Sequence, residues 1–207
     1  LLGEAGSLGN LAAILVGIGD HDGAARAAER SLALGHAAGD EFISTTAMQV
    51  TAHIARDRGD LEGAEQLYRR VLELSTRGGL DAQIGERMRL LGEIRLQRGD
   101  IAEGRELLDD SLERERERGS RTGTAQALAY RAELDLLDGD HAAAIDRLEE
   151  ALSLHAVEGK PFEIMNCHHG LARARLLAGD LAAAQYELEA GLRLAWSLGY
   201  RLHAVGM

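Results

Sequence analysis

The only cluster of soft metal ligands in the sequence is the run Cys167-His168-His169. On a helix, adjacent side chains point in different directions, so these three cannot bind one metal ion by themselves. Cys167 is also the only cysteine, which excludes an internal disulfide and is typical of a reducing, cytoplasmic compartment. We therefore predict structural or surface roles for the three residues, no metal site, and a cytoplasmic protein.

Three short segments resemble ligand-binding loops in composition but not in spacing. Residues 17–23 are rich in glycine, yet the glycines are not spaced as in a dinucleotide-binding loop. Residues 119–124 lack the Gly-Lys-Ser/Thr of a phosphate loop, and residues 138–140 lack the later glycine and glutamate of a calcium loop. The sequence also lacks His-Glu-x-x-His and serine-elbow motifs. We therefore predict that the chain is not an enzyme and uses no cofactor.

Charge and composition exclude further classes of partner. The 34 acidic and 23 basic side chains give a formal charge of −11, which would repel a nucleic-acid backbone. No apolar stretch reaches the roughly 18 residues that a membrane span needs. The 3% aromatic content and the single proline, Pro161, argue against a β-rich fold. We expect neither nucleic acid nor a membrane as a direct partner.

The elements that must position any site follow a repeat of 40 residues. Gly-Asp recurs with this period from Gly19-Asp20 to Gly179-Asp180, and a second glycine column recurs halfway between, from Gly39 to Gly199. The segments between successive glycines are rich in Ala, Leu, Glu and Arg, which favour helices. Glycine can close a helix in the left-handed conformation, and the Asp can cap the next one. We predict ten helices, each ending within about two residues of a column glycine.

Apolar and small residues within these segments follow the helical period. In the last unit the stripe consists of Leu181, Ala184, Leu188, Gly191, Leu192 and Ala195. Another column in each helix stays small, and we predict that its members are buried at helix crossings: Ala52, Gly92, Ala132, Ala172, Ala64 and Ala144. By contrast, we interpret the charged run 113–118 as a solvated helix end that its opposite charges stabilise.

The third unit carries the features of a known repeat, in this order: Met88, Leu91, Gly92, Gly99, Asp100, Gly104, Leu108 and Leu112. On these residues the chain resembles the tetratricopeptide repeat over essentially its whole length. The 40-residue period is similar to that of repeats in bacterial regulators of the maltose-activator and antibiotic-regulator types, and in kinesin-light-chain-like adaptors.

The resemblance implies an all-α fold, namely a right-handed superhelical α-solenoid of about five helix-turn-helix units. These units would form one domain over residues 1–207. Their approximate bounds are 1–39, 40–79, 80–119, 120–159 and 160–199, followed by the truncated start of a sixth at 200–207.

In the tetratricopeptide family, the first helix of each unit lines the concave face of the superhelix. Carried over by register, this implies that the ligand-binding residues are Gln49, His53, Arg56, Glu86, Arg89, Glu93, Gln126, Tyr130, Glu133, Asn166, His169 and Arg173. Asp57 would lie at the rim. These polar and nearly neutral positions suit a peptide or a polar small molecule; the alternative is that they only solvate the inner wall.

The resemblance therefore predicts a non-catalytic protein-protein interaction scaffold that binds a peptide or protein segment in its concave groove. We expect it to be a fragment of a larger bacterial regulatory or signalling protein. The alternative is an effector-sensing domain, which would bind a small molecule in the groove and control an attached NTPase or DNA-binding domain.

The C-terminal end calls for a separate prediction, because the last unit of a solenoid has no following unit to cover it. Trp196 occupies a column that is mostly polar in the other units. An exposed tryptophan is typical of interfaces. We predict that Trp196 and Leu202 contact a second copy, as in a homodimer, or a continuation of the chain. The alternative is that Trp196 folds back onto Leu202 and Val205.

Overall fold

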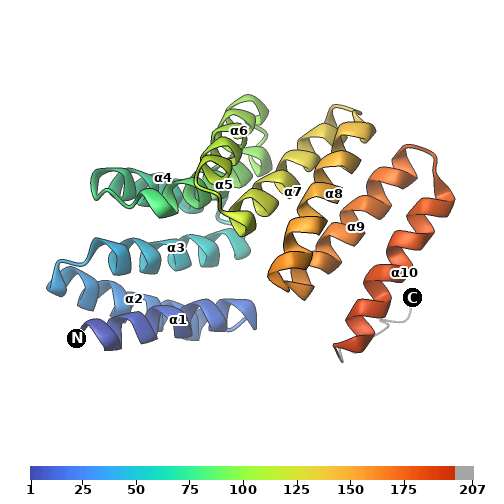
Figure 1. The fold of residues 1–207 in the computed structure, drawn as a ribbon. Coiled ribbons are helices and arrows are strands. Elements are labelled where there is room, and N and C mark those ends of the chain that lie inside the picture. The colour runs from blue at the N-terminus through green and yellow to red at the C-terminus, as the bar shows by residue number, and fades with distance from the viewer. Residues whose placement is uncertain (199–207) are drawn as a thin grey trace. The chain divides into compact units, whose positions relative to one another are not determined.

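The computed structural model describes residues 1–198, which form ten α-helices and no strands (Figure 1). The helices are α1 (Leu2–Gly17), α2 (His21–Ala38), α3 (Glu41–Asp57), α4 (Leu61–Arg77), α5 (Asp81–Gln97), α6 (Ile101–Glu117), α7 (Arg121–Leu137), α8 (His141–Glu158), α9 (Pro161–Leu177) and α10 (Leu181–Ser197). This confirms the predicted all-α fold of helix-turn-helix units. None of the helices within residues 1–198 has both the length and the apolarity needed to cross a membrane.

The helix ends lie where the two glycine columns predict them. Each helix ends within two residues of its column glycine, and the nine column glycines from Gly19 to Gly179 all have φ between +63° and +89°. Non-glycine residues rarely adopt this left-handed conformation, so these turns require glycine. In four units the following Asp accepts a hydrogen bond from the backbone N–H three residues later, as Asp60 does from Gly63 at 2.9 Å.

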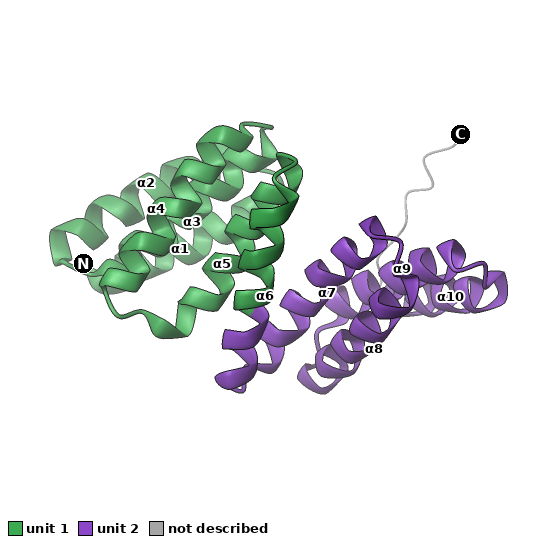
Figure 2. Ribbon diagram, turned by 90° about the horizontal axis from the view of Figure 1, so that it is seen from above, with its two compact units in different colours: residues 1–111 green, residues 112–207 purple. Residues whose placement is uncertain are grey.

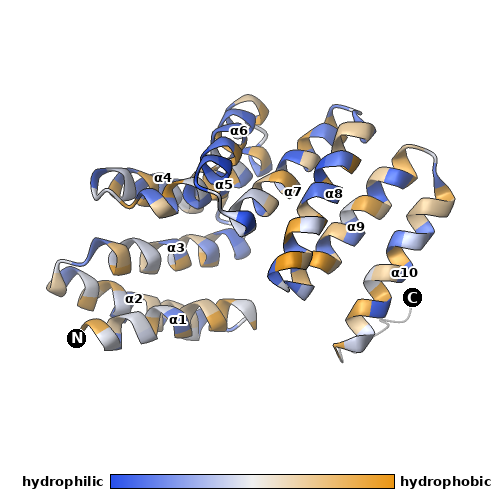
Figure 3. Ribbon diagram, viewed as in Figure 1, coloured by the Kyte–Doolittle hydropathy of each residue, from blue (hydrophilic) through white to orange (hydrophobic). Residues whose placement is uncertain are grey.

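The chain divides into two compact units, residues 1–111 and residues from Leu112 onward, with the boundary inside α6 (Figure 2). In unit 1, α1 packs against α2 and α3, and α4 packs against both α3 and α5. In unit 2, α8 packs against α7 and α9, and α9 also packs against α10. Each helix carries both hydrophilic and hydrophobic residues, as amphipathic helices do (Figure 3).

The columns of small residues are buried, as predicted. The members Ala52, Ala64, Ala132, Ala144, Ala172 and Gly92 all lie in the interior. In unit 1, a Cβ atom at Gly92 would lie only 3.1 Å from the Gly104 carbonyl oxygen. Small residues therefore allow paired helix backbones to approach this closely.

The prediction of a solvated helix end at residues 113–118 is wrong for Glu115. The Glu115 side chain is buried, lies against Gly123, and forms an ion pair with Arg118 at 3.1 Å. Its repeat equivalents Ser75 and His155 are buried too. Residues of this column face the first helix of the following repeat. For Glu115 that helix is α7, where Gly123 has no side chain and so leaves room for the Glu115 carboxylate.

One ion pair recurs with its charges exchanged. In the fourth repeat, Arg147 Nε donates to Asp135 Oδ2 at 2.6 Å. One repeat later, Arg175 Nε lies 3.5 Å from Glu187 Oε1. Arg175 occupies the position of Asp135, and Glu187 occupies that of Arg147. Both sites therefore pair an acidic with a basic side chain. The first helix carries the acid in the fourth repeat and the base in the fifth.

Candidate functional site

Six of the predicted ligand-binding residues lie together on α3 and α5 of unit 1. We call these the unit 1 wall: Gln49, His53, Arg56, Glu86, Arg89 and Glu93. Hydrogen bonds join the two first helices, because Gln49 Nε2 donates to Glu86 Oε1 at 3.0 Å and Arg56 Nη1 donates to Glu93 Oε1 at 3.3 Å. Side chains of successive first helices therefore form one connected polar surface within this unit.

His53 forms the centre of the unit 1 wall and is held from behind by α4. Its Nδ1 lies 2.8 Å from the hydroxyl of the buried Tyr68, and the two rings meet edge to face. Burial, together with the nearby Arg56 and Arg89, lowers the pKa of His53 to about 4. The imidazole is therefore neutral at pH 7, so Nδ1 accepts the hydrogen bond from Tyr68. Burial also raises the pKa of Tyr68, which keeps the phenol protonated.

The members of the unit 1 wall differ in their access to solvent. Glu86 is exposed, and Gln49, His53 and Arg56 are partly exposed. Arg89 is buried beneath them, with its Nη1 3.7 Å from Glu93 Oε2. Burial of an arginine requires a charged partner, and Glu93 provides one. A ligand would therefore meet the exposed members first, while Arg89 supports Glu93 from below.

The other six predicted residues lie on α7 and α9 of unit 2. We call these the unit 2 wall: Gln126, Tyr130, Glu133, Asn166, His169 and Arg173. An ion pair between Arg173 and Glu133 joins the two first helices. Asn166, His169 and Arg173 are exposed, and the three residues on α7 are partly buried. That the two walls share one concave surface stays a prediction.

His169 and Arg173 also border an apolar depression of about 370 Å³ between α9 and α10. Leu176, Leu181 and Leu188 line much of it. The sequence register did not predict this depression. A polar wall next to an apolar depression can bind a ligand that has both kinds of group.

The Cys167-His168-His169 cluster separates into three environments. Cys167 is buried, and burial raises the pKa of its thiol to about 11. His168 Nδ1 lies 2.7 Å from Glu187 Oε2, whereas the His169 side chain is exposed. Within residues 1–198, no group of three or more His, Cys, Asp or Glu side chains is placed to hold a metal ion. Glu187 was not among the predicted residues; it is a carboxylate at a position that holds Leu in two other repeats.

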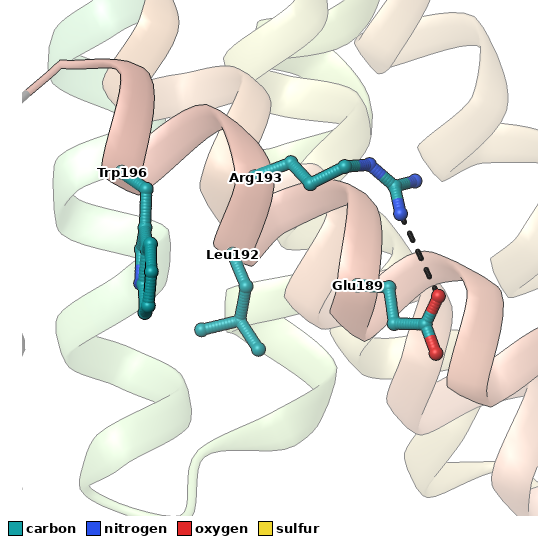
Figure 4. A pocket seen from close by; sticks show the side chains of 4 residues that line it. All are labelled: Glu189, Leu192, Arg193 and Trp196. Atoms are coloured by element: carbon teal, nitrogen blue, oxygen red, sulfur yellow. Dashed lines mark ion pairs between the residues drawn. The ribbon is translucent and has the colours of Figure 1, made fainter.

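Trp196 lies at the C-terminal end of α10, with its side chain 74% exposed. With Leu192 it borders a depression of about 430 Å³, beside an ion pair between Glu189 and Arg193 (Figure 4). Leu202, the second predicted interface residue, lies outside the described residues.

Comparison with known proteins supports the repeat assignment. Residues 86–156 match the tetratricopeptide repeat family. A comparison with curated protein sequences found no match. The tetratricopeptide match covers about a third of the chain, and it spans the repeat from which the resemblance was drawn.

Solved structures with this fold cover nearly the whole chain. BtubC (BKLC) from P. vanneervenii is 18% identical, with a TM-score of 0.73 over 97% of this chain and 83% of that one. The repeats of a putative kinesin light chain from Podospora anserina are 17% identical, with a TM-score of 0.66 over 97% and 99% of the two chains. A STAND protein with a tetratricopeptide repeat sensor, from Pyrococcus horikoshii, is 14% identical, with a TM-score of 0.72 over 96% of this chain and 31% of that one. The chain therefore has the tetratricopeptide-repeat solenoid fold.

Proposed function

We propose that this chain is a non-catalytic scaffold that binds a peptide or protein segment along the walls formed by its first helices. The observation that carries this proposal is the bonding between successive first helices: Gln49 with Glu86, Arg56 with Glu93, and Arg173 with Glu133. These contacts hold polar side chains in fixed positions before a ligand arrives. Such preorganisation lowers the entropy cost of binding.

The charge of the walls supports a peptide rather than a polyanion. In the unit 1 wall, Arg56 and Arg89 balance Glu86 and Glu93, and in the unit 2 wall Arg173 balances Glu133. The chain's formal charge of −11 is therefore carried elsewhere. Alternating donors and acceptors match a peptide backbone with mixed side chains. We assign the chain to the 40-residue subgroup of tetratricopeptide repeats and infer a cytoplasmic place within a larger bacterial regulator.

The experiment is a selection from a random peptide library on the 207-residue chain, followed by titration of the selected peptides. Arg56→Ala should weaken the binding of a peptide on the unit 1 wall by about tenfold, and Arg173→Ala should do the same for a peptide on the unit 2 wall, as expected for arginines at an interface. Arg70→Ala and Arg114→Ala are matched controls, because both arginines are exposed on second helices. Peptides that lose affinity with the controls and not with the wall variants would overturn the proposal.

A second candidate function is an effector-sensing domain that binds a small molecule and controls an attached NTPase or DNA-binding domain. The depression of about 370 Å³ bordered by His169 and Arg173 favours it, because a concave site with both polar and apolar groups can hold a small ligand. The similarity to a STAND protein with a repeat sensor supports it too. A thermal-shift screen separates the candidates, since a ligand at 100 times its Kd adds about 2.7 kcal/mol to the free energy of unfolding.

A further inference from the structure

The first helix, α1, exposes apolar side chains at repeat positions that are buried elsewhere. Ile14 is 63% exposed, whereas its equivalent Ile54 is only 4% exposed and Ile94 is fully buried. Leu11 is also exposed, whereas its equivalent Leu91 is buried. In the internal repeats, these positions contact the second helix of the preceding repeat. We call the exposed surface around Leu11 and Ile14 the α1 face.

The last helix, α10, exposes the opposite half of the same kind of contact. Leu188 is 50% exposed, whereas its equivalent Tyr68 is 1% exposed and Leu148 is buried. Leu192, one turn further on, is exposed as well. In the internal repeats these positions contact the first helix of the following repeat. We call the surface around Leu188 and Leu192 the α10 face; Leu188 borders the depression of about 370 Å³ and Leu192 the depression of about 430 Å³ described above.

The α1 face and the α10 face are complementary because an internal junction already joins their equivalents. At the junction of α4 and α5, Tyr68 and Leu72 pack with Leu91 and Ile94. Replacing each residue by its repeat equivalent puts Leu188 and Leu192 of α10 against Leu11 and Ile14 of α1. We propose that α10 of one copy binds α1 of a second copy, head to tail, and reproduces this internal junction. The inference concerns the ends of the chain and does not depend on the proposed function.

The same register gives Trp196 a partner. In unit 2, Arg116 Nη2 donates to Glu150 Oε2 at 2.8 Å, which links the second helices of consecutive repeats. Trp196 is the repeat equivalent of Arg116, and Arg30 is the repeat equivalent of Glu150. At the proposed junction, Trp196 of one copy therefore takes the place of Arg116, and Arg30 of the second copy takes the place of Glu150. Both side chains are exposed within one chain, where Arg30 also forms an ion pair with Glu4 at 3.0 Å. A guanidinium over an indole ring is a favourable cation–π contact, so this substitution preserves an attraction at the junction.

A head-to-tail contact joins two different surfaces, so each added copy leaves one face of each kind open. The weight-average mass from sedimentation or light scattering should therefore rise continuously with protein concentration. A symmetric contact between two α10 faces would stop at the dimer. A mass that stays at that of one chain at high micromolar concentration overturns the proposal and leaves these faces to other proteins or to further repeats.

Two double variants test the pairing of the faces directly. Leu11→Glu with Ile14→Glu blocks the α1 face, and Leu188→Glu with Leu192→Glu blocks the α10 face. All four residues are exposed in the single chain, so the substitutions should leave its helix content and melting behaviour nearly unchanged. Each double variant alone should be monomeric. An equimolar mixture should form a one-to-one heterodimer, because one intact face of each kind remains.

The control and the contrary outcomes are equally definite. Leu137→Glu with Val157→Glu adds the same charge at exposed apolar positions outside both faces and should associate as the unchanged chain does. Self-association of the α1-face variant would show a contact between two α10 faces, and self-association of the α10-face variant would show one between two α1 faces. Either result, or a mixture that stays monomeric, overturns head-to-tail pairing. If a glutamate variant is misfolded, the corresponding alanine pair should weaken association by roughly tenfold or more.

Discussion

The hydroxyl of Tyr68 on α4 lies 2.8 Å from Nδ1 of His53 on α3, and this hydrogen bond ties the core of unit 1 to its polar wall. Tyr68 occupies the bulky packing column, where the three later repeats have Leu108, Leu148 and Leu188. The phenol therefore fills the space of a leucine and also orients an imidazole on the surface. Few side chains can serve both the core and a binding surface in this way.

The first prediction is that Tyr68→Phe lowers the free energy of unfolding by about 1–2 kcal/mol. The ring still fills the core, but Nδ1 of His53 loses its donor. Denaturant unfolding measures the change. Tyr186→Phe is the matched control, because Tyr186 is exposed on α10 and its substitution should change stability very little. Equal effects of the two substitutions would show that the hydrogen bond contributes nothing.

The second prediction concerns pH. Because the folded chain lowers the pKa of His53 to about 4 from its ordinary value of 6.5, the unfolded chain binds an extra proton between these values. The contribution of His53 to stability is therefore complete above pH 6.5 and is lost as the pH falls toward 4. The slope is at most about 1.4 kcal/mol per pH unit.

His53→Gln should make stability less dependent on pH over this range, which unfolding curves at several pH values can show. Burial lowers the pKa of His155 as well. This second histidine is present in both proteins, so its contribution cancels in the comparison. Parallel curves for the two proteins would contradict a neutral, buried His53.

The third prediction is that Ala132→Leu destabilises the chain by roughly 1–3 kcal/mol. Ala132 is buried among Ala144 and Leu148, where a larger side chain must displace its neighbours. Ala142→Leu on the exposed side of α8 is the control and should be nearly neutral. An unchanged denaturation midpoint for Ala132→Leu would contradict close packing at this crossing.

The fourth prediction couples Gly123 to Glu115. Alanine usually stabilises a helix relative to glycine, but a Cβ at Gly123 would overlap the buried carboxylate of Glu115. Gly123→Ala should therefore destabilise the unchanged chain, whereas in a Glu115→Ala background it should be neutral or stabilising. A double-mutant cycle on unfolding free energies should give a coupling of about 1 kcal/mol or more. Additive effects would show that the two residues do not share this space.

The helix ends and the small columns were predictable from the sequence because both depend on local features that recur every 40 residues. A glycine in the left-handed conformation ends a helix whatever lies around it, and a column that stays small in every repeat indicates close backbones. Trp196 was predictable as an exposed residue for the same reason, since its column is exposed in the other repeats as well.

The burial of Arg89 and Glu115 was not predictable in the same way. Both residues are charged, and their ion-pair partners, Glu93 and Arg118, lie only four and three residues further along the chain. Such spacing is common at exposed helix positions and does not indicate burial. The helical register predicts the direction in which a side chain points, but it does not predict how deeply that side chain is buried. A different ion pair is visible in the sequence itself: the acid Asp135 and the base Arg147 are replaced one repeat later by the base Arg175 and the acid Glu187. Compensating charge exchange between repeats identifies contacts within a single sequence.

The most direct test of the central claim is to locate a bound peptide on the helices. A library-selected peptide that carries a photoreactive residue is cross-linked to the chain, and the cross-linked residues are identified by mass spectrometry. We expect cross-links on the first helices, α3 and α5 in unit 1 or α7 and α9 in unit 2, and their loss on competition with unlabelled peptide. Competable cross-links confined to the second helices α2, α4, α6, α8 and α10 would contradict it.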